Sequence, residues 1–428
     1  MYSPPTSPLP AALRREVGVF GATLLGLGSI LGTGVFVSLA IAAGIAGPWV
    51  ILATALAAVV AACNALSSAQ LAAAHPVSGG AYEYGYRYLS PLLGFTAGWT
   101  FLCAKSASAA TAALGFSGYA LNLLAPGPPS QSVLLAVGIV LVFTLVAACG
   151  IRQSNAANLV IVSITVLALL CFVAGVAPAA LTRAGLPSES LPTDGGAGFV
   201  RDLLHASALM FVAYTGYGRI ATLGEEIRDP RRTIPRAIVT TLVFSALLYV
   251  AVATVAVGAA GAPALSAAAQ AYAAPLEVVA RRHGVPGLHW LVALGAVTAM
   301  AGVLLNLILG LSRILLAMGR RQDAPGVLAR LNTEATTPYV AVWVAGGLIA
   351  ALTLLGDIKT TWSFSAFTVL IYYSITNLAA LRLPPAARLY SRAWAWGGLG
   401  SCFFLAFWVE QRVWLAGIGI LLLGLVWY

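Results

Sequence analysis

The stretch that decides the fold is Gly28-Ser-Ile-Leu-Gly-Thr-Gly-Val-Phe36, GSILGTGVF, which lies inside an apolar run from about 17 to 46. That run is long enough to cross a bilayer, which takes about 20 apolar residues in a helix. Residues 28–34 nevertheless include three glycines, a serine and a threonine, and a glycine weakens a helix by about 1 kcal/mol relative to alanine. The pattern predicts a membrane-spanning helix that is interrupted at mid-membrane depth.

The composition of the whole chain supports a membrane location. Its 428 residues are 60% hydrophobic and only 8% charged, with a mean hydropathy of +0.92. Soluble domains are about 25% charged, so the composition excludes a soluble protein and indicates an all-α protein that crosses the membrane many times. We expect twelve transmembrane helices, near residues 17–46, 48–73, 90–124, 132–150, 156–180, 200–224, 235–261, 287–318, 338–355, 360–381, 393–409 and 411–428.

Basic residues are distributed unevenly between the predicted loops, and the net charge is +10. With the N-terminus inside, fifteen Lys and Arg residues fall on the cytoplasmic side and six on the outer side. Because cytoplasmic loops carry the excess of Lys and Arg, we expect both termini in the cytoplasm and no nucleic-acid partner. Residues 1–16 are expected to be a proline-rich cytoplasmic leader rather than a signal peptide.

Residues 213–219, AYTGYGR, interrupt the sixth predicted span in the same way. Five crossings separate the starts of the first and sixth spans, so the two interrupted helices run in opposite directions. Such pairs are typical of inverted-repeat secondary transporters, whose substrate site lies between the breaks. We therefore expect inverted five-helix repeats at 17–180 and 200–382, and two additional helices at 393–428. The alternative is that the glycines merely permit close helix packing.

Longer stretches around both interruptions carry a family resemblance. LGLGSILGTGVFV (25–37), HPVSGGAYEYGYRYLSPLLGFTAGW (75–99), FVAYTGYGRIATLGEEIRDPRRTIPRAI (211–238) and SRILLAMGRRQDAP (312–325) are similar to parts of the amino acid–polyamine–organocation permeases. The resemblance implies the leucine-transporter fold with helices 1 and 6 broken. It also implies alternating-access transport of amino acids across the cytoplasmic membrane of a bacterium, without catalysis or a cofactor. The branch resembled most is the bacterial relatives of cationic amino acid transporters.

The two breaks offer complementary groups to an α-amino acid. Amides freed in the first break, at the end of a half-helix, suit a carboxylate, and carbonyls freed at 212–216 suit an ammonium group. The resemblance implies the same roles for the amides of Thr33 and Gly34 and for the carbonyls of Ile30, Val212 and Thr215. Next to the second break, Tyr214, Tyr217 and Arg219 are candidate gating residues. The expected substrate-binding residues are Ile30, Gly32, Thr33, Gly34, Lys105, Val212, Ala213, Thr215, Gly216 and Asn306.

Lys105 lies within a predicted span and has no acidic residue near it in the sequence. An intramembrane lysine is costly and is by default a functional hypothesis, and the resemblance places it close to the substrate. It would contact the substrate or carry a proton; snorkelling to the inner surface is the alternative. Further positions expected to face the site are Ala109 and Ala112 on the third span and Ser363 and Phe364 on the tenth.

Polar segments outside the spans are few. Residues 79–88 and 265–282 are expected to form short helices, the first at the inner surface and the second outside. Charged residues from Glu225 to Arg236 are expected at the cytoplasmic mouth. They are either solvated loop charges, each worth little, or ion pairs that break when an inner gate opens.

The resemblance also bears on the coupling ion. Proton-coupled relatives carry a lysine on helix 5 where this chain has Thr165, and sodium-coupled relatives need hydroxyls on helix 8 where it has Ala301 and Gly302. We therefore expect sodium-independent transport and no metal site. Proton coupling, exchange and facilitated passage stay open, as do the amino acid carried, a polyamine or other organic cation as substrate, and a monomeric or dimeric state.

Two other functional classes are disfavoured by the sequence. A channel would need a ring of pore-lining charges, and a membrane-embedded enzyme would need a cluster of His, Asp, Glu or Cys at one surface. The four histidines and five cysteines are scattered, without ligand or disulfide spacing. The transporter interpretation is therefore favoured.

Overall fold

The computed structural model describes residues 17–77, 79–124, 129–150, 155–183, 197–222, 226–332 and 337–428, so the predicted leader at 1–16 lies outside the described residues. The described residues form helices joined by turns and loops, with one isolated bridge between Val17 and Ile227. Its α-helices are α1 (Val19–Ile30), α2 (Leu39–Ala46), α3 (Val50–Ala74), α4 (Ala81–Tyr88), α5 (Pro91–Leu124), α6 (Pro129–Ala148), α7 (Asn155–Arg183), α8 (Ala197–Tyr214), α9 (Gly218–Ala221), α10 (Pro230–Ala260), α11 (Ala262–Tyr272), α12 (Pro275–Arg282), α13 (Leu288–Arg321), α14 (Tyr339–Thr353), α15 (Ile358–Leu381), α16 (Arg392–Ala406) and α17 (Gln411–Trp427). Shorter turns are the π-helical η1 (Gly34–Ser38) and the 3-10 turns η2 (Gly47–Trp49), η3 (Thr215–Tyr217), η4 (Gly326–Ala329) and η5 (Pro385–Ala387).

Every predicted span coincides with a helix or with helices separated by a short break. By length and composition, six helical segments of the described chain could cross a membrane, or seven if α16 and α17, bent by 113°, form one span. This number is lower than twelve because residues 19–74 count as one segment of 56 residues, α16 and α17 count together as one span at most, and α5 and α8 are not among the six. In addition, α14, with 15 residues, is shorter than the roughly 20 that a crossing takes.

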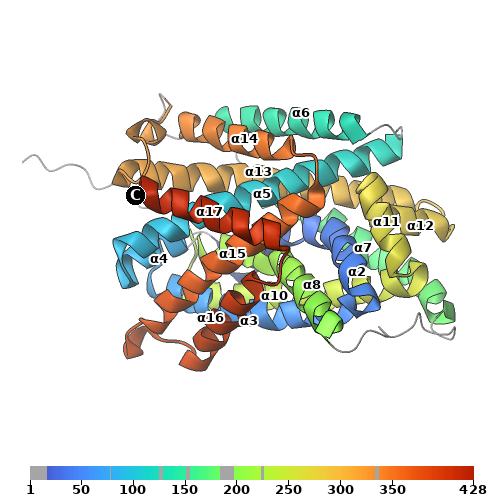
Figure 1. The fold of residues 1–428 in the computed structure, drawn as a ribbon, viewed down its shortest axis with the longest axis horizontal. Coiled ribbons are helices and arrows are strands. Elements are labelled where there is room, and N and C mark those ends of the chain that lie inside the picture. The colour runs from blue at the N-terminus through green and yellow to red at the C-terminus, as the bar shows by residue number, and fades with distance from the viewer. Residues whose placement is uncertain are drawn as a thin grey trace, which may run out of the picture.

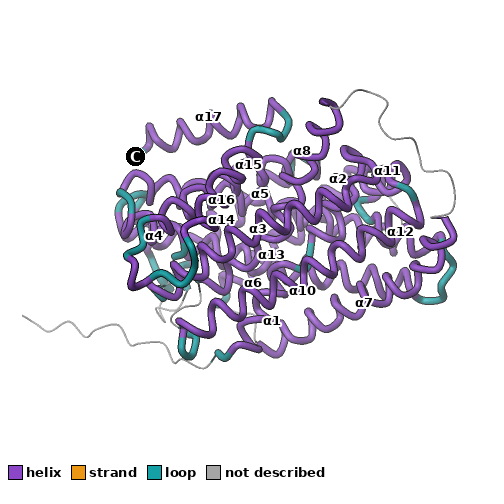
Figure 2. The backbone as a smooth tube through the Cα atoms, turned by 90° about the horizontal axis from the view of Figure 1, so that it is seen from below, coloured by secondary structure: helices purple, strands orange, loops and turns teal. Residues whose placement is uncertain are grey.

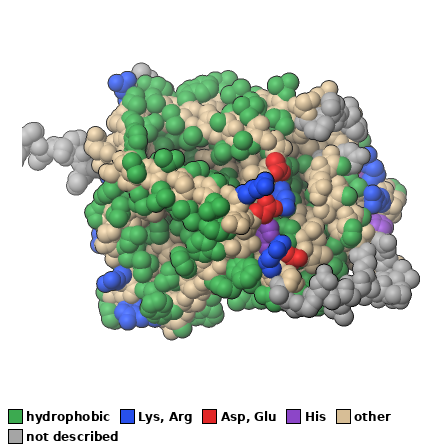
Figure 3. All heavy atoms as spheres, in the orientation of Figure 1, with side chains coloured by type: hydrophobic (Ala, Val, Ile, Leu, Met, Phe, Trp, Pro, Cys, Tyr) green, Lys and Arg blue, Asp and Glu red, His purple; other side chains and the backbone are tan. Residues whose placement is uncertain are grey.

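The surface of the bundle is that of a multi-pass membrane protein. Large apolar side chains such as Phe20, Leu134 and Leu247 are at least 70% exposed. Figure 3 shows hydrophobic side chains covering much of one face. A soluble monomer rarely exposes so much contiguous apolar surface, whereas a lipid-facing helix bundle must, because its backbone groups are satisfied internally.

The long helices run roughly side by side, and short helices cap the two ends (Figure 1). Helix α4 lies at one end, called the α4 end below, and α11 and α12 lie at the other, called the α12 end. Loops gather mainly at these two ends (Figure 2). The helices predicted near 79–88 and 265–282 are confirmed as α4 and as the pair α11 and α12.

Hydroxyl groups join the helices that surround the centre of the bundle. Ser365 on α15 donates to the carbonyl of Ala104 on α5 at 2.9 Å, and its Oγ lies 2.7 Å from that of Ser108. Trp362, also on α15, donates to the carbonyl of Leu209 on α8 at 3.0 Å. Small side chains and interhelical hydrogen bonds replace the hydrophobic effect as the cohesive force in a membrane. They hold α5, α8 and α15 together around the two interrupted segments.

Candidate functional site

The first interruption is a true break in the helix. Helix α1 ends at Ile30, and Leu31 is extended with φ −73° and ψ 100°. Helical structure resumes at Thr33 and widens into the π-helical η1. The break therefore lies at Leu31–Gly32, inside the predicted range. The amides of Thr33 and Gly34 fall in the first turn of the second half-helix, where N–H groups have no intrahelical acceptor.

The second interruption differs from the prediction. Residues 212–216 were expected to unwind, but α8 continues to Tyr214 and is followed by the 3-10 turn η3. Hydroxyl groups take up the carbonyls that unwinding would have freed: Thr215 Oγ1 donates to Val212 O at 2.9 Å, and Tyr373 donates to Thr215 O at 3.2 Å. A tightened turn keeps most backbone bonding, so the chain changes pitch here without opening.

The two interrupted segments touch through glycines. A Cβ added to Gly216 would lie 2.3 Å from the carbonyl oxygen of Ser29, and one added to Gly34 would lie 2.4 Å from the Cβ of Ala213. Both glycines therefore permit close packing of the two segments. Tyr249 on α10 spans the same junction, because its hydroxyl donates to Ile30 O at 2.7 Å and lies 3.4 Å from Ala213 O.

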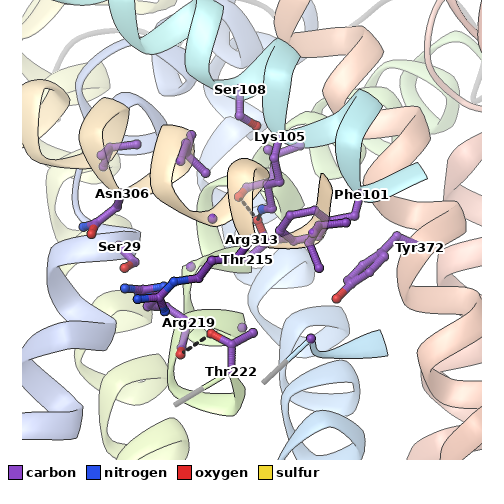
Figure 4. A pocket seen from close by; sticks show the side chains of 18 of the residues that line it. Ser29, Phe101, Lys105, Ser108, Thr215, Arg219, Thr222, Asn306, Arg313 and Tyr372 are labelled. Atoms are coloured by element: carbon purple, nitrogen blue, oxygen red, sulfur yellow. Dashed lines mark hydrogen bonds between the residues drawn. The ribbon is translucent and has the colours of Figure 1, made fainter. Parts of the chain in front are cut away.

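A cavity of about 610 Å³ begins at this junction (Figure 4) and reaches the α4 end, where Gly79, Glu83 and Arg321 line it. Its volume is within the range of small-molecule pockets, roughly 300–1,000 Å³. Nine of the ten residues expected to bind substrate line it: Ile30, Thr33, Gly34, Lys105, Val212, Ala213, Thr215, Gly216 and Asn306.

Three other candidates are placed differently by the structure. Gly32 does not line the cavity, since a Cβ there would lie 2.7 Å from the side chain of Val303. Tyr214 is buried and donates to Thr54 O at 3.2 Å, and the ring of Tyr217 packs against Tyr373 with centroids 5.6 Å apart. Of the three gating candidates, only Arg219 borders the cavity.

On α5 and α15, the residues that line the cavity are on a different face of the helix from the residues predicted from the sequence. Ala109 and Ala112 are buried in the packing of α5, and the cavity is lined instead by Phe101, Lys105 and Ser108. These three are spaced at i, i+4 and i+7, which marks one face of a helix. On α15, Trp362, Tyr372 and Tyr373 line the cavity in place of Ser363 and Phe364. If Lys105 marks the face of α5 that borders the cavity, helical spacing places Phe101 and Ser108 on the same face.

Two polar groups of the cavity wall, one buried and one partly buried, lie at the junction of the interrupted segments. The hydroxyl of Thr33 is inaccessible and has no hydrogen-bond partner among the described residues. Lys105 Nζ donates to Thr215 Oγ1 at 3.0 Å, which joins α5 to the second interruption (Figure 4). The ammonium of Lys105 therefore lies at the junction, and snorkelling to a membrane surface does not describe its position.

At the α12 end, a hydrogen-bonded cluster around Tyr119 joins α5, η1 and α12. The Tyr119 hydroxyl donates to Phe36 O at 2.9 Å and accepts from the amide of Leu276, at the start of α12, at 3.3 Å. Glu277 is fully buried, accepts from the side chain of Asn122 and from Arg281 Nε at 2.9 Å, and was not predicted from the sequence. Its place within PLEVVARR, one turn before Arg281, was the only sequence signal for this ion pair.

At the α4 end, where the cavity is open, charged side chains form specific contacts. Arg321 pairs with Glu83 and lies 4.2 Å from the ring centroid of Tyr86. Burial raises the pKa of Glu83 above its usual value, against the opposing effect of Arg321. Of the charged residues predicted at this mouth, Glu225 lies outside the described residues and Glu226 lines the cavity. Asp229 and Arg232 form an exposed pair at 3.9 Å, as expected for solvated loop charges.

Comparisons with known proteins give a consistent result. The sequence model of the amino acid permease family matches residues 21–428. An uncharacterized transporter of Mycobacterium tuberculosis is 39% identical over 425 residues, covering 98% of this chain and 92% of that protein. A branched-chain amino acid permease of Bacillus subtilis is 28% identical, covering 87% and 82%. Cationic amino acid transporter 4 of Mus musculus is 30% identical, covering 89% of this chain and 62% of its own length.

Proposed function

Because this chain belongs to the amino acid permease family, we propose that it is a secondary transporter that moves α-amino acids across the cytoplasmic membrane of a bacterium by alternating access. The proposal includes twelve membrane crossings, arranged as inverted repeats at 17–180 and 200–382 with two further helices at 393–428. Both termini are cytoplasmic, so the α4 end faces the cytoplasm. The excess of basic residues on that side supports this orientation.

The observation that carries the proposal is the buried, unpartnered hydroxyl of Thr33 beside the cavity. Buried polar groups are normally satisfied, so an unpartnered hydroxyl on a residue of the cavity wall favours a polar group bound there. The substrate carboxylate accepts from this hydroxyl and from the amides of Thr33 and Gly34, at the start of a half-helix where an anion is favoured.

The amino group of the substrate is assigned to the carbonyls of Ile30, Val212 and Thr215. Each of these oxygens already accepts one hydroxyl, from Tyr249, Thr215 and Tyr373 respectively. A carbonyl oxygen has two lone pairs, so Ile30 O and Val212 O each have one left for an ammonium N–H. Thr215 O also accepts from the backbone N–H of Gly218, so it contributes to the substrate site only if that turn bond is given up.

The arrangement of the two ends supports an inward-facing state. The cavity reaches the α4 end, while Tyr119 and Glu277 hold α12 over the other end. Transport then requires the α12 cluster to open and the α4 end to close. Arg219 is proposed to take part in closing, since it shares the cavity wall with Glu226.

Transport is proposed to be sodium-independent, with proton coupling, exchange and facilitated passage as the three remaining modes. Thr165, where proton-coupled relatives have lysine, donates to Ile161 O in its own helix at 2.8 Å. Thr165 is also not among the residues that line the cavity. We therefore propose that it does not take over the function of that lysine.

Uptake into proteoliposomes tests the proposed function. The purified protein is reconstituted, and each labelled amino acid is offered with an unlabelled amino acid inside, with a pH gradient, and with a sodium gradient. We expect uptake of at least one amino acid by exchange or with the pH gradient, and no stimulation by sodium. No uptake or exchange of any amino acid under these conditions would refute the proposal.

A further inference from the structure

Among the described residues, the cavity wall carries an excess of positive charge. Two of these lining residues are acidic, Glu83 and Glu226, and five are basic, Lys105, Arg219, Arg313, Arg320 and Arg321. Figure 4 shows Arg219 and Arg313 close together below Lys105. Such a wall attracts anions and repels cations, because charges in a cleft with apolar walls focus the field into it.

The basic residues differ in how they are compensated. Arg321 is paired with Glu83 at the α4 end of the cavity. Lys105 and Arg219 form no ion pair with any described residue, and Lys105 donates to a neutral acceptor, the hydroxyl of Thr215. An uncompensated cation in a water-poor interior is costly, and an anionic partner removes that cost.

Lys105 also lies at a fixed place relative to the two interruptions. Thr215, which it contacts, precedes Gly216, and Gly216 is packed directly on the backbone of Ser29 and Ile30. Thr33 follows three residues after Ile30. An ammonium has three N–H donors, and the Thr215 bond uses one of them. Lys105 and Thr33 line the same cavity, so a molecule whose carboxylate lies at Thr33 can present a second anionic group to Lys105.

We propose that the cavity is selective for amino acids with an anionic side chain, and that Lys105 is the specificity-determining residue that binds the side-chain carboxylate. This inference rests on the proposed function and adds the substrate class to it. The α-carboxylate lies at Thr33 and Gly34, the side-chain carboxylate accepts from Lys105, and Arg219 adds positive potential on the α4 side. Cationic amino acids and polyamines are disfavoured, because they would add a positive charge to a wall that already has an excess.

The competing assignment is that Lys105 binds the α-carboxylate of any amino acid. The two assignments differ in what Lys105→Met does. If Lys105 binds the side chain, the variant loses acidic substrates while glutamine and asparagine, which have the same shape, are retained. If Lys105 binds the α-carboxylate, uptake of all amino acids falls alike.

The test measures competition in proteoliposomes. Unlabelled glutamate, aspartate, glutamine, leucine, lysine and putrescine compete with a labelled amino acid that the protein transports, in the wild type and in Lys105→Met and Lys105→Arg. We expect the acidic amino acids to compete at least ~10-fold better than glutamine in the wild type, the size of a charged hydrogen bond. We expect Lys105→Met to abolish that ratio and Lys105→Arg to keep most of it.

Lys359→Met is the matched control. Lys359 is the only other lysine of the chain and pairs with Glu410 outside the cavity. The control makes the same change in charge and should leave the ratio of acid to amide unchanged.

Three results separate the inference from the proposed function. Preference of the wild type for neutral or cationic amino acids would overturn the inference and leave amino acid transport intact. An equal loss of all substrates in Lys105→Met, in protein that remains monodisperse on size exclusion, would also overturn it. Absence of any amino acid transport in the wild type would refute the proposed function itself.

Discussion

Gly216→Ala tests whether the two interrupted segments must touch. The added Cβ would lie 2.3 Å from Ser29 O, 2.4 Å from Ser29 C and 2.5 Å from Ile30 N. All three atoms belong to the backbone, so no side-chain rotation relieves the clash, and η3 must move away from α1. This would widen the junction from which the cavity begins.

The expected free-energy cost of Gly216→Ala follows from the kind of atoms that the added Cβ would meet. Overpacking usually costs about 1–3 kcal/mol, and a clash with backbone atoms belongs at the upper end, about 3 kcal/mol. That corresponds to an approximately 150-fold change in an equilibrium constant. We expect the melting temperature of the purified protein to fall by on the order of 5 °C, and amino acid exchange in proteoliposomes to fall by at least ~10-fold.

Gly310→Ala is the matched control, because Gly310 lines the same cavity and a Cβ there would meet no atom within 4 Å. Its melting temperature should equal or slightly exceed that of the wild type, since alanine is favoured over glycine within a helix. If Gly216→Ala exchanged and melted like Gly310→Ala, the close contact of the two segments would not be required for function.

Three further predictions concern the groups around the cavity. Tyr249→Phe leaves Ile30 O without its 2.7 Å hydrogen bond, so we expect a loss of about 1–3 kcal/mol, measured as a lower melting temperature, with weaker amino acid binding; unchanged values for both would contradict this role. Tyr119→Phe removes the bond to Phe36 O. We expect an impermeant thiol reagent added at the α12 end to label Asn306→Cys several-fold faster, in a variant lacking the five native cysteines; equal rates would argue against a closing role. For Glu83, burial raises the pKa, so the folded state binds a proton more tightly than the unfolded state and stability should increase as pH falls through the window between the two pKa values. Melting curves from pH 4 to 8 should show this gain relative to Glu83→Gln, and parallel curves would exclude it.

The interruptions were predictable from the sequence because several glycine and hydroxyl residues close together inside an apolar run disfavour a regular spanning helix. The break after Ile30 falls within the predicted range. The π-helical turn at Gly34–Ser38 was not predictable, since the apolar pattern of GVFVS is the same for either helix type. In the second interruption, Gly216 does not mark a point of unwinding, in contrast to the prediction. Its lack of a side chain serves close contact with Ser29 and Ile30, and the backbone around it stays helical.

The cavity wall was harder to predict than the breaks. The positions on α1 and α8 followed from the motifs, but those on α5 and α15 depend on helix rotation, which a nearly uniform apolar and small-residue pattern does not reveal. Lys105 is the only charged residue on α5, so it was the one residue of this helix for which the sequence alone indicated a position at the cavity. The cluster at the α12 end depends on contacts between Asn122 and Glu277, 155 residues apart in the chain, and no local pattern signals such a pairing.

The central claim is that an amino acid binds between the two interrupted segments. A structure of the protein with its best-transported amino acid bound tests this most directly. We predict the α-carboxylate at about 3 Å from the hydroxyl of Thr33 and the amide of Gly34, with the amino group facing the carbonyls of Ile30 and Val212. An amino acid bound elsewhere, or with its carboxylate turned away from Thr33, would contradict the account.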